Sequence, residues 1–145
     1  MQIWGSSMAD PAFLAFFAAL SLNDPAPEGA VGEAERHIGR ALPHDYRAFF
    51  AISDGYDDVI GKGHLSLWPA GQLALRNEAY GVSRRVTDLV LIGSDGGGAV
   101  YGIDWARGAP QFISVPFASI ERAGVRVLAA TFEDFLRVVA NGDAA

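Results

Sequence analysis

The sequence predicts a single domain of the α+β class, with helices towards both ends of the chain and hairpin-linked strands between them. Its 145 residues are the size of one domain. Helical periodicity is found near both ends, whereas the middle contains short apolar runs separated by turn residues. Because these runs are joined mainly by turns, the pattern favours an α+β fold over alternating βαβ units.

The first predicted helix is an apolar stretch at Phe13–Leu22. Asp10 and Pro11 ahead of it are typical of a helix start, and Asn23 marks its end. Ten residues are too few to span a bilayer as a helix, and no Lys or Arg precedes them as in a secretory signal. The chain therefore divides into an N-terminal extension with this helix at 1–27, a domain at 28–140 and a tail at 141–145.

Two further helices are predicted in the first third of the chain. One covers Val31–Ile38, and Gly39 is suited to end it in a left-handed conformation. The other begins after Pro43 and carries aromatic residues at positions i, i+3 and i+4. That spacing places three rings on one stripe facing the core, namely Tyr46, Phe49 and Phe50.

The middle of the chain is predicted to form strands. They are short, rich in apolar residues and bounded by glycine or proline, at Leu65–Trp68, Val86–Ile92, Ala99–Asp104 and Pro110–Val115. The second and third form a hairpin around the turn Gly93–Gly98. The polar segment Tyr56–Gly63 is expected to be a loop, and Pro69–Tyr80 a short helix.

The last helix has a clear start and one apolar face. Thr131 is suited to cap it, with Asp134 three residues on in a variant of the capping box. Its apolar residues recur at helical spacing, at Phe132, Phe135, Leu136 and Val139. We therefore expect this helix to cover the core and to end at Asn141-Gly142.

Charge and cysteine content narrow the classes of function. Lys and Arg number 11 against 17 Asp and Glu, giving a net charge of −6. Such a surface repels phosphate backbones and anionic lipid, which disfavours nucleic-acid and membrane partners and favours a basic protein. The absence of cysteine excludes thiol nucleophiles, disulfides and cysteine metal sites, and it suits a reducing compartment. We expect a cytoplasmic protein.

The glycine-rich segment Gly93–Gly98 is interpreted as a turn that needs a positive φ. A phosphate-binding P-loop requires Lys and then Ser or Thr after its glycines, whereas Ala99 and Val100 follow here. The dinucleotide fingerprint also fails, because Tyr101 occupies the place of its third glycine.

No catalytic or metal-binding pattern is found in the sequence. The three histidines, His37, His44 and His64, have spacings that match no zinc-ligand pattern, and no serine lies in a GxSxG elbow. Two aspartates would form a glycosidase pair only if they faced one cleft. We therefore expect no cofactor, no metal and no enzymatic activity.

Four aspartates and one tryptophan are the candidate partner-binding residues. Asp54, Asp57 and Asp58 crowd the loop after the third helix, and Asp95 lies in the glycine-rich turn. Trp105, expected beside that turn, is either an interface anchor or a packing residue. These residues form one surface only if the glycine-rich hairpin and the Asp57 loop lie on the same side. Solvated loop carboxylates are the simpler interpretation of the acids.

Seven short motifs follow one another along the chain, at Glu33–Gly39, Leu42–Phe50, Asp54-Gly55, Trp68-Pro69, Asn77–Tyr80, Ile92–Gly98 and Ala130–Leu136. In this order and spacing they resemble the SUKH superfamily, the Smi/Knr-like domain, over about residues 28–140. One departure is Asp54, at a position where that family often has Asn.

The resemblance implies an α+β domain with a central, mostly antiparallel sheet flanked by helices, and no catalytic activity. It also implies an intracellular immunity protein that binds and neutralises a toxin, as bacterial members do or are proposed to do. The net charge points to a basic toxin, and the resemblance implies that such a toxin is often a nuclease or a deaminase. The alternative is a cytosolic scaffold or regulatory domain of the same fold. A hydrolase that uses two aspartates is a third class, but nothing in the sequence orders the carboxylates into acid and base.

Overall fold

The structure is a computed structural model in which residues 20–144 are described. The helices are α2 (Ala30–Ile38), α3 (His44–Phe49), α4 (Ala70–Tyr80), α5 (Val82–Arg85) and α6 (Phe132–Ala140), with a 3-10 turn at Arg122–Gly124. The strands are β1 (Tyr56–Ile60), β2 (Gly63–Leu67), β3 (Leu89–Ser94), β4 (Ala99–Asp104), β5 (Gln111–Pro116) and β6 (Arg126–Ala129).

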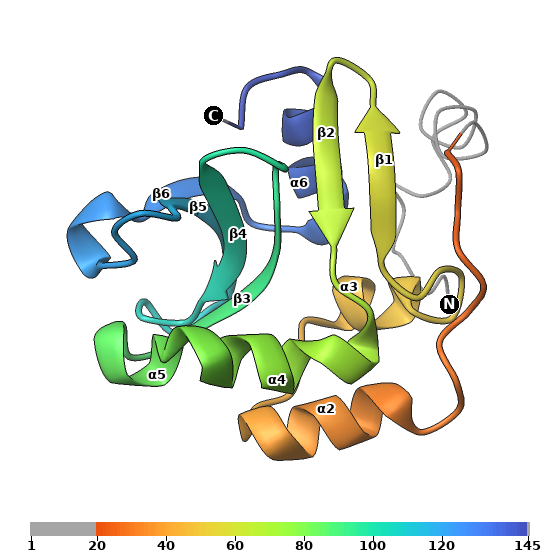
Figure 1. Ribbon diagram of the computed structural model, residues 1–145, viewed down its shortest axis with the longest axis horizontal. Coiled ribbons are helices and arrows are strands. Elements are labelled where there is room, and N and C mark those ends of the chain that lie inside the picture. The colour runs from red at the N-terminus through yellow and green to blue at the C-terminus, as the bar shows by residue number, and fades with distance from the viewer. Residues whose placement is uncertain (1–19, 145) are drawn as a thin grey trace.

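The strands form one antiparallel sheet in which each strand pairs with its neighbours in sequence, in the order β1-β2-β3-β4-β5-β6. Helix α6 packs against one face of the sheet together with α3, and α4 and α5 lie across β3 with α2 beyond α4 (Figure 1). The predicted single α+β domain, with helices flanking an antiparallel sheet, is confirmed.

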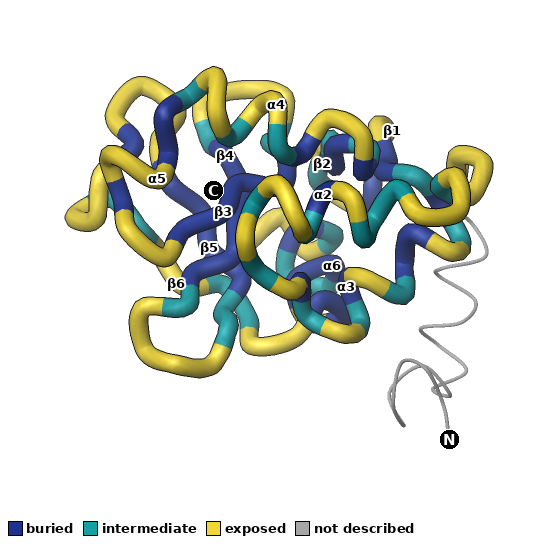
Figure 2. The backbone as a smooth tube through the Cα atoms, turned by 90° about the horizontal axis from the view of Figure 1, so that it is seen from below, coloured by how far each residue is buried: buried dark blue, intermediate teal, exposed yellow. Residues whose placement is uncertain are grey.

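The aromatic core lies between the sheet and the helices α3 and α6, whose backbones are largely buried or half-buried where they face it (Figure 2). The predicted stripe of α3, formed by Tyr46, Phe49 and Phe50, is buried. Phe135 of α6 stacks on Phe112 of β5 at 5.4 Å and meets Tyr101 of β4 edge-on at 5.1 Å. These rings join two helices to the central strands, so both ends of the described chain share one core.

The predicted cap of α6 is confirmed, because the Thr131 hydroxyl accepts a hydrogen bond from the Asp134 N–H at 3.1 Å. A second cap comes from α3, where a carboxylate oxygen of Asp45 accepts the N–H of Phe132 at 2.7 Å. Two of the N–H groups in the first turn of α6 therefore find acceptors, one locally and one across the core.

The prediction of a loop at Tyr56–Gly63 is wrong, because this segment contains β1 and the tight turn into β2. Only Tyr56 and Ile60 of β1 are buried, and three exposed residues lie between them. Asp57 and Asp58 are also poor strand formers. The apolar alternation that identifies a strand is therefore missing, and the pairing with β2 creates the strand.

Two further elements were not predicted. Edge strand β6 has a largely exposed four-residue pattern, and α5 occupies one turn directly before the expected strand. The strand predicted from Val86 begins instead at Leu89, after Asp88 adopts a positive φ of 69°. The helix predicted at Phe13–Leu22 falls almost wholly outside the described residues.

We expect Tyr46→Phe to raise the stability of the domain by about 1 kcal/mol at neutral pH. The buried Tyr46 hydroxyl has no hydrogen-bond partner among the described residues, and an unpaired buried polar group costs about 1–3 kcal/mol. Burial raises the pKa of Tyr46 above its usual value of 10.0, and nearby Asp54 raises it further.

The same substitution should matter more at alkaline pH. The phenol of Tyr46 ionises in the unfolded chain above pH 10 but stays neutral in the folded protein. The free energy of unfolding of the parent therefore falls as pH rises above 10, and the variant lacks this loss. Burial and Asp95 raise the pKa of Tyr101 to about 12, which adds the same dependence to both proteins. Denaturant midpoints at about pH 7 and about pH 11 test this. A variant less stable than the parent at both values would contradict it.

Candidate functional site

Asp54 holds the start of α4. Its carboxylate accepts a hydrogen bond from the N–H of Ala70 at 2.8 Å, and its own N–H donates to the carbonyl of Asp24 at 2.8 Å. Asp54 is half-buried. Its side chain therefore fixes the approach of the chain to α4, a contact that spans 16 residues.

Asp95 holds the turn between β3 and β4. Its carboxylate accepts hydrogen bonds from the N–H groups of Gly97 at 2.8 Å and Ala99 at 3.1 Å. Gly96 within the turn has a φ of 79°, the positive value that the glycine-rich segment predicts. Both of these candidate carboxylates therefore stabilise the backbone of the domain itself, Asp95 locally and Asp54 across 16 residues.

Asp57 lies beside the glycine-rich turn. Its carboxylate pairs with the ring of His64 at 3.3 Å across the β1–β2 hairpin, and the Asp57 side chain is 74% exposed. A Cβ added to Gly96 would lie 2.9 Å from the His64 ring. The structure thus brings Asp57, His64 and the Asp95 turn onto one continuous surface.

Asp58 is exposed but points to the other side of the hairpin. Side chains alternate along a strand, and Asp58 pairs with Leu65 whereas Asp57 pairs with Ser66. Asp58 accepts only the N–H of the adjacent Val59 at 2.7 Å among the described residues. The two neighbouring acids therefore belong to different surfaces.

The expected position of Trp105 beside the glycine-rich turn is wrong. Trp105 follows the opposite end of β4 from that turn. The guanidinium of Arg40 lies 4.5 Å from its ring centroid, and Arg40 also pairs with Asp88 at 2.9 Å. Trp105 is half-buried against the core, so it joins the region after α2 to the sheet.

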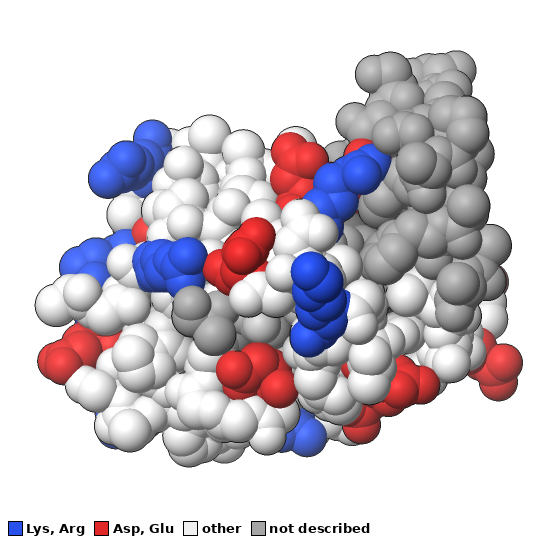
Figure 3. Space-filling view, turned by 90° about the horizontal axis from the view of Figure 1, so that it is seen from above, with Lys and Arg blue, Asp and Glu red and all other residues white. Residues whose placement is uncertain are grey.

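Charges of both signs are interspersed on the face seen in Figure 3. The exposed acids of this chain therefore do not gather into a purely acidic region there. Among the described residues, no group of three histidine or acidic side chains is placed to hold a metal ion. The described helices are also too short or too polar to cross a membrane.

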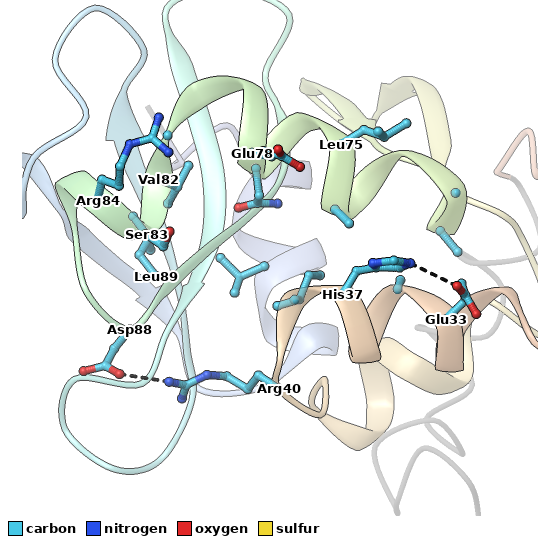
Figure 4. Close-up of a pocket in the computed structure, with 18 of the residues that line it drawn as sticks. Glu33, His37, Arg40, Leu75, Glu78, Val82, Ser83, Arg84, Asp88 and Leu89 are labelled. Atoms are coloured by element: carbon cyan, nitrogen blue, oxygen red, sulfur yellow. Dashed lines mark hydrogen bonds and ion pairs between the residues drawn. The ribbon is translucent and has the colours of Figure 1, made fainter.

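A groove of about 770 Å³ runs between α2 on one side and α4 and α5 on the other (Figure 4). Its charged rim is largely paired within itself, by Glu33 with His37 at 3.0 Å and by Arg40 with Asp88 at 2.9 Å. Leu75 lies on the α4 side and is 68% exposed. The sequence analysis missed this close helix pair. The signal that could have indicated it is the small residues at i and i+4 of both helices, Ala30, Ala34, Ala70 and Ala74.

A smaller hollow of about 220 Å³ lies between α4 and the glycine-rich turn. Three aromatic rings surround it, with Trp68 to Tyr80 at 5.9 Å and Tyr80 to Phe117 at 5.4 Å. The Arg76 guanidinium lies 5.0 Å from the Trp68 ring centroid. Trp68 directly follows β2, Arg76 and Tyr80 belong to α4, and Phe117 directly follows β5, so the sequence alone did not place them together.

The fold defines a small α+β domain built on an antiparallel meander, with surface hollows beside its central helices. A family model described as the SMI1 / KNR4 family (SUKH-1) matches residues 25–138, and the chain belongs to this family. The family is one of immunity proteins and regulators. No curated protein matches the chain. The resemblance inferred from the ordered motifs is confirmed.

Substituting two of the candidate acids should separate their roles. Asp54→Ala is expected to lower the free energy of unfolding by about 1–2 kcal/mol, because the first N–H of α4 loses its acceptor. Asp57→Ala should change it by less than about 0.5 kcal/mol, because only an exposed ion pair is lost. Urea denaturation of both variants measures the difference, and equal losses would contradict these assignments.

Proposed function

We propose that this chain is a non-catalytic, intracellular immunity protein that neutralises a basic, nuclease-type toxin by binding it. The observation that carries the proposal is the family match over residues 25–138. Immunity proteins of this kind work by contact with another protein, so the proposal concerns surfaces and not a reacting group.

The hydrogen bonds of the motif side chains support a binding role. Asp45, Asp54 and Asp95 each direct a carboxylate oxygen at backbone N–H groups of the domain itself. Asn77 bonds the backbone of β3 in the same way. A general acid or base must instead reach a proton of the substrate. The most distinctive polar residues of the family motifs are therefore occupied in holding the fold.

The net charge of −6 supports a basic partner. Complementary charge accelerates diffusional encounter more than it changes the final affinity, and salt screens it. We therefore expect the association rate with the toxin to fall as the salt concentration rises, while the dissociation rate changes less.

The test is to produce this chain together with the toxin encoded beside its gene and to score cell survival. The purified chain and the toxin's catalytic domain are then mixed, and binding and toxin activity are measured at low and raised salt. Survival, binding and inhibition are expected. A toxin that is neither bound nor inhibited would overturn the proposal.

The presence of regulators in the same family supports a second candidate, a cytosolic scaffold or regulatory domain. A gene with no toxin beside it, together with reproducible binding to a housekeeping protein, would favour this candidate over the immunity function.

A further inference from the structure

The aromatic hollow has the composition of a binding hot spot. Its wall contains Trp68, Tyr80 and Arg76, and tryptophan, tyrosine and arginine are the residues most enriched among hot spots of protein interfaces. Phe117 completes the wall and is 49% exposed. It is the one aromatic side chain among the large hydrophobic residues that the described chain leaves exposed.

The size of the hollow favours a side chain over a free ligand. Small-molecule pockets usually enclose about 300–1,000 Å³, whereas this hollow has about 220 Å³. Val100 and Ser94 line the sheet side, and Gly96 and Gly97 line the turn side. The glycines leave one wall without side chains, so a partner backbone can approach closely there.

The charge around the hollow is complementary to a basic neighbour. The turn that lines it carries Asp95, and Gly96 of that turn lies beside His64, which pairs with exposed Asp57. Arg76 is the cation at the hollow, and it lies over the Trp68 ring. A cationic side chain of the partner would therefore be attracted to the Asp57 side of the hollow.

We propose that the toxin docks on this aromatic hollow, inserting one large apolar side chain there and placing a Lys or Arg beside Asp57. The inference rests on the proposed immunity function and adds the surface that carries it. The groove between α2 and α4 is the competing surface. The pairs Glu33–His37 and Arg40–Asp88 already satisfy four of the six charged or histidine side chains that line it, the other two being Glu78 and Arg84.

The test measures the dissociation constant of the toxin's catalytic domain by calorimetry for matched variants of the full chain. Phe117→Ala is expected to weaken binding by about 30-fold, because truncating a hot-spot residue has an effect of that order. Leu75→Ala is the control, since it removes a more exposed apolar side chain from the competing groove. The dissociation constant of Leu75→Ala for the toxin should stay within about twofold of that of the parent chain.

A second pair of variants tests the charged side of the hollow. Asp57→Lys and Asp58→Lys make the same charge change at neighbouring residues that point to opposite sides of the β1–β2 hairpin. We expect Asp57→Lys to raise the dissociation rate about tenfold or more and Asp58→Lys to affect mainly the association rate. Equal dissociation rates would contradict a basic residue beside Asp57.

Each outcome decides between the two proposals. If the parent chain does not bind the toxin, the immunity function is overturned. If the parent binds but Phe117→Ala binds within about twofold of it, the docking surface alone is overturned. Loss of binding in Leu75→Ala instead assigns the contact to the groove. Should Phe117→Ala fail to fold, Gly97→Leu adds bulk at the hollow where only ordinary contacts lie near a new Cβ, and it should weaken binding similarly.

Discussion

Replacing Gly93 with alanine should destabilise the domain by about 3 kcal/mol, because the added methyl group has no space. Its Cβ would lie 2.0 Å from the carbonyl oxygen of Ser66 and 3.0 Å from the Cα of Leu67, both backbone atoms of β2. The two strands pair only at Ser66–Ser94 and Leu67–Gly93, so moving them apart breaks this contact. We expect the β1–β2 hairpin to separate from the sheet.

Gly98→Ala is the matched control for this substitution. Among the described residues other than its chain neighbours, no atom lies within 4 Å of a Cβ built on Gly98, and the φ of Gly98 is not positive. Its stability should therefore equal that of the parent or exceed it by up to about 1 kcal/mol, through the lower entropy of the unfolded chain. Urea denaturation of the two variants provides the comparison. A Gly93→Ala protein with an unchanged midpoint would show that β2 and β3 adjust without cost.

Asn77→Ala should lower the free energy of unfolding by about 2–4 kcal/mol, because it leaves two backbone groups unpaired. The Asn77 amide nitrogen donates to the carbonyls of Leu73 and Leu91, both at 2.8 Å. Its amide oxygen accepts the N–H of Leu91 at 2.8 Å. Pairing of β3 with β2 does not reach Leu91, so one side chain of α4 takes the place of a neighbouring strand.

Two variants and one local measurement test this role. Gln72→Ala, on the same helix, removes only an exposed contact with Arg76 and should cost less than about 0.5 kcal/mol. Asn77→Asp keeps the acceptor for the Leu91 N–H but turns a carboxylate oxygen towards the carbonyls of Leu73 and Leu91, so its loss should be at least as large as that of Asn77→Ala. Hydrogen exchange at the Leu91 amide should accelerate in Asn77→Ala relative to the parent. Unchanged protection of that amide would contradict the role assigned to Asn77.

Strong periodicity made parts of the fold predictable. The strand Ala99–Asp104 was placed with its observed bounds, and the helix after Thr131 was placed with its cap. The predicted stripe on α3 was also correct, because helical spacing places the three rings on one face, and burial of that face removes all of them from water. These elements carry their own signal in neighbouring residues.

Elements whose conformation depends on distant partners were harder to predict from the sequence. Strand β1 owes its conformation to pairing with β2, since Asp57 and Asp58 interrupt its apolar pattern. Edge strand β6 is short and largely exposed, so its residues resemble those of a loop. In both cases the tertiary pairing overrides a weak local preference.

The candidate site shows the same limit. Asp54 and Asp95 were predicted as partner-binding residues because they are loop acids. Their carboxylates instead accept hydrogen bonds from backbone N–H groups, and for Asp54 that group lies 16 residues away. The hollow around Phe117 joins residues from several distant segments of the chain, an arrangement that spacing along the chain does not reveal.

The position of α6 at the C-terminal end of the domain has a consequence for synthesis on the ribosome. Phe132 and Phe135 complete a core whose other members, such as Tyr46 and Phe112, are translated earlier. Until the last helix emerges, one apolar face of the sheet stays open to water and to other nascent chains. A message truncated before Phe132 should therefore yield an aggregating product that proteases remove, even though every strand of the sheet is encoded.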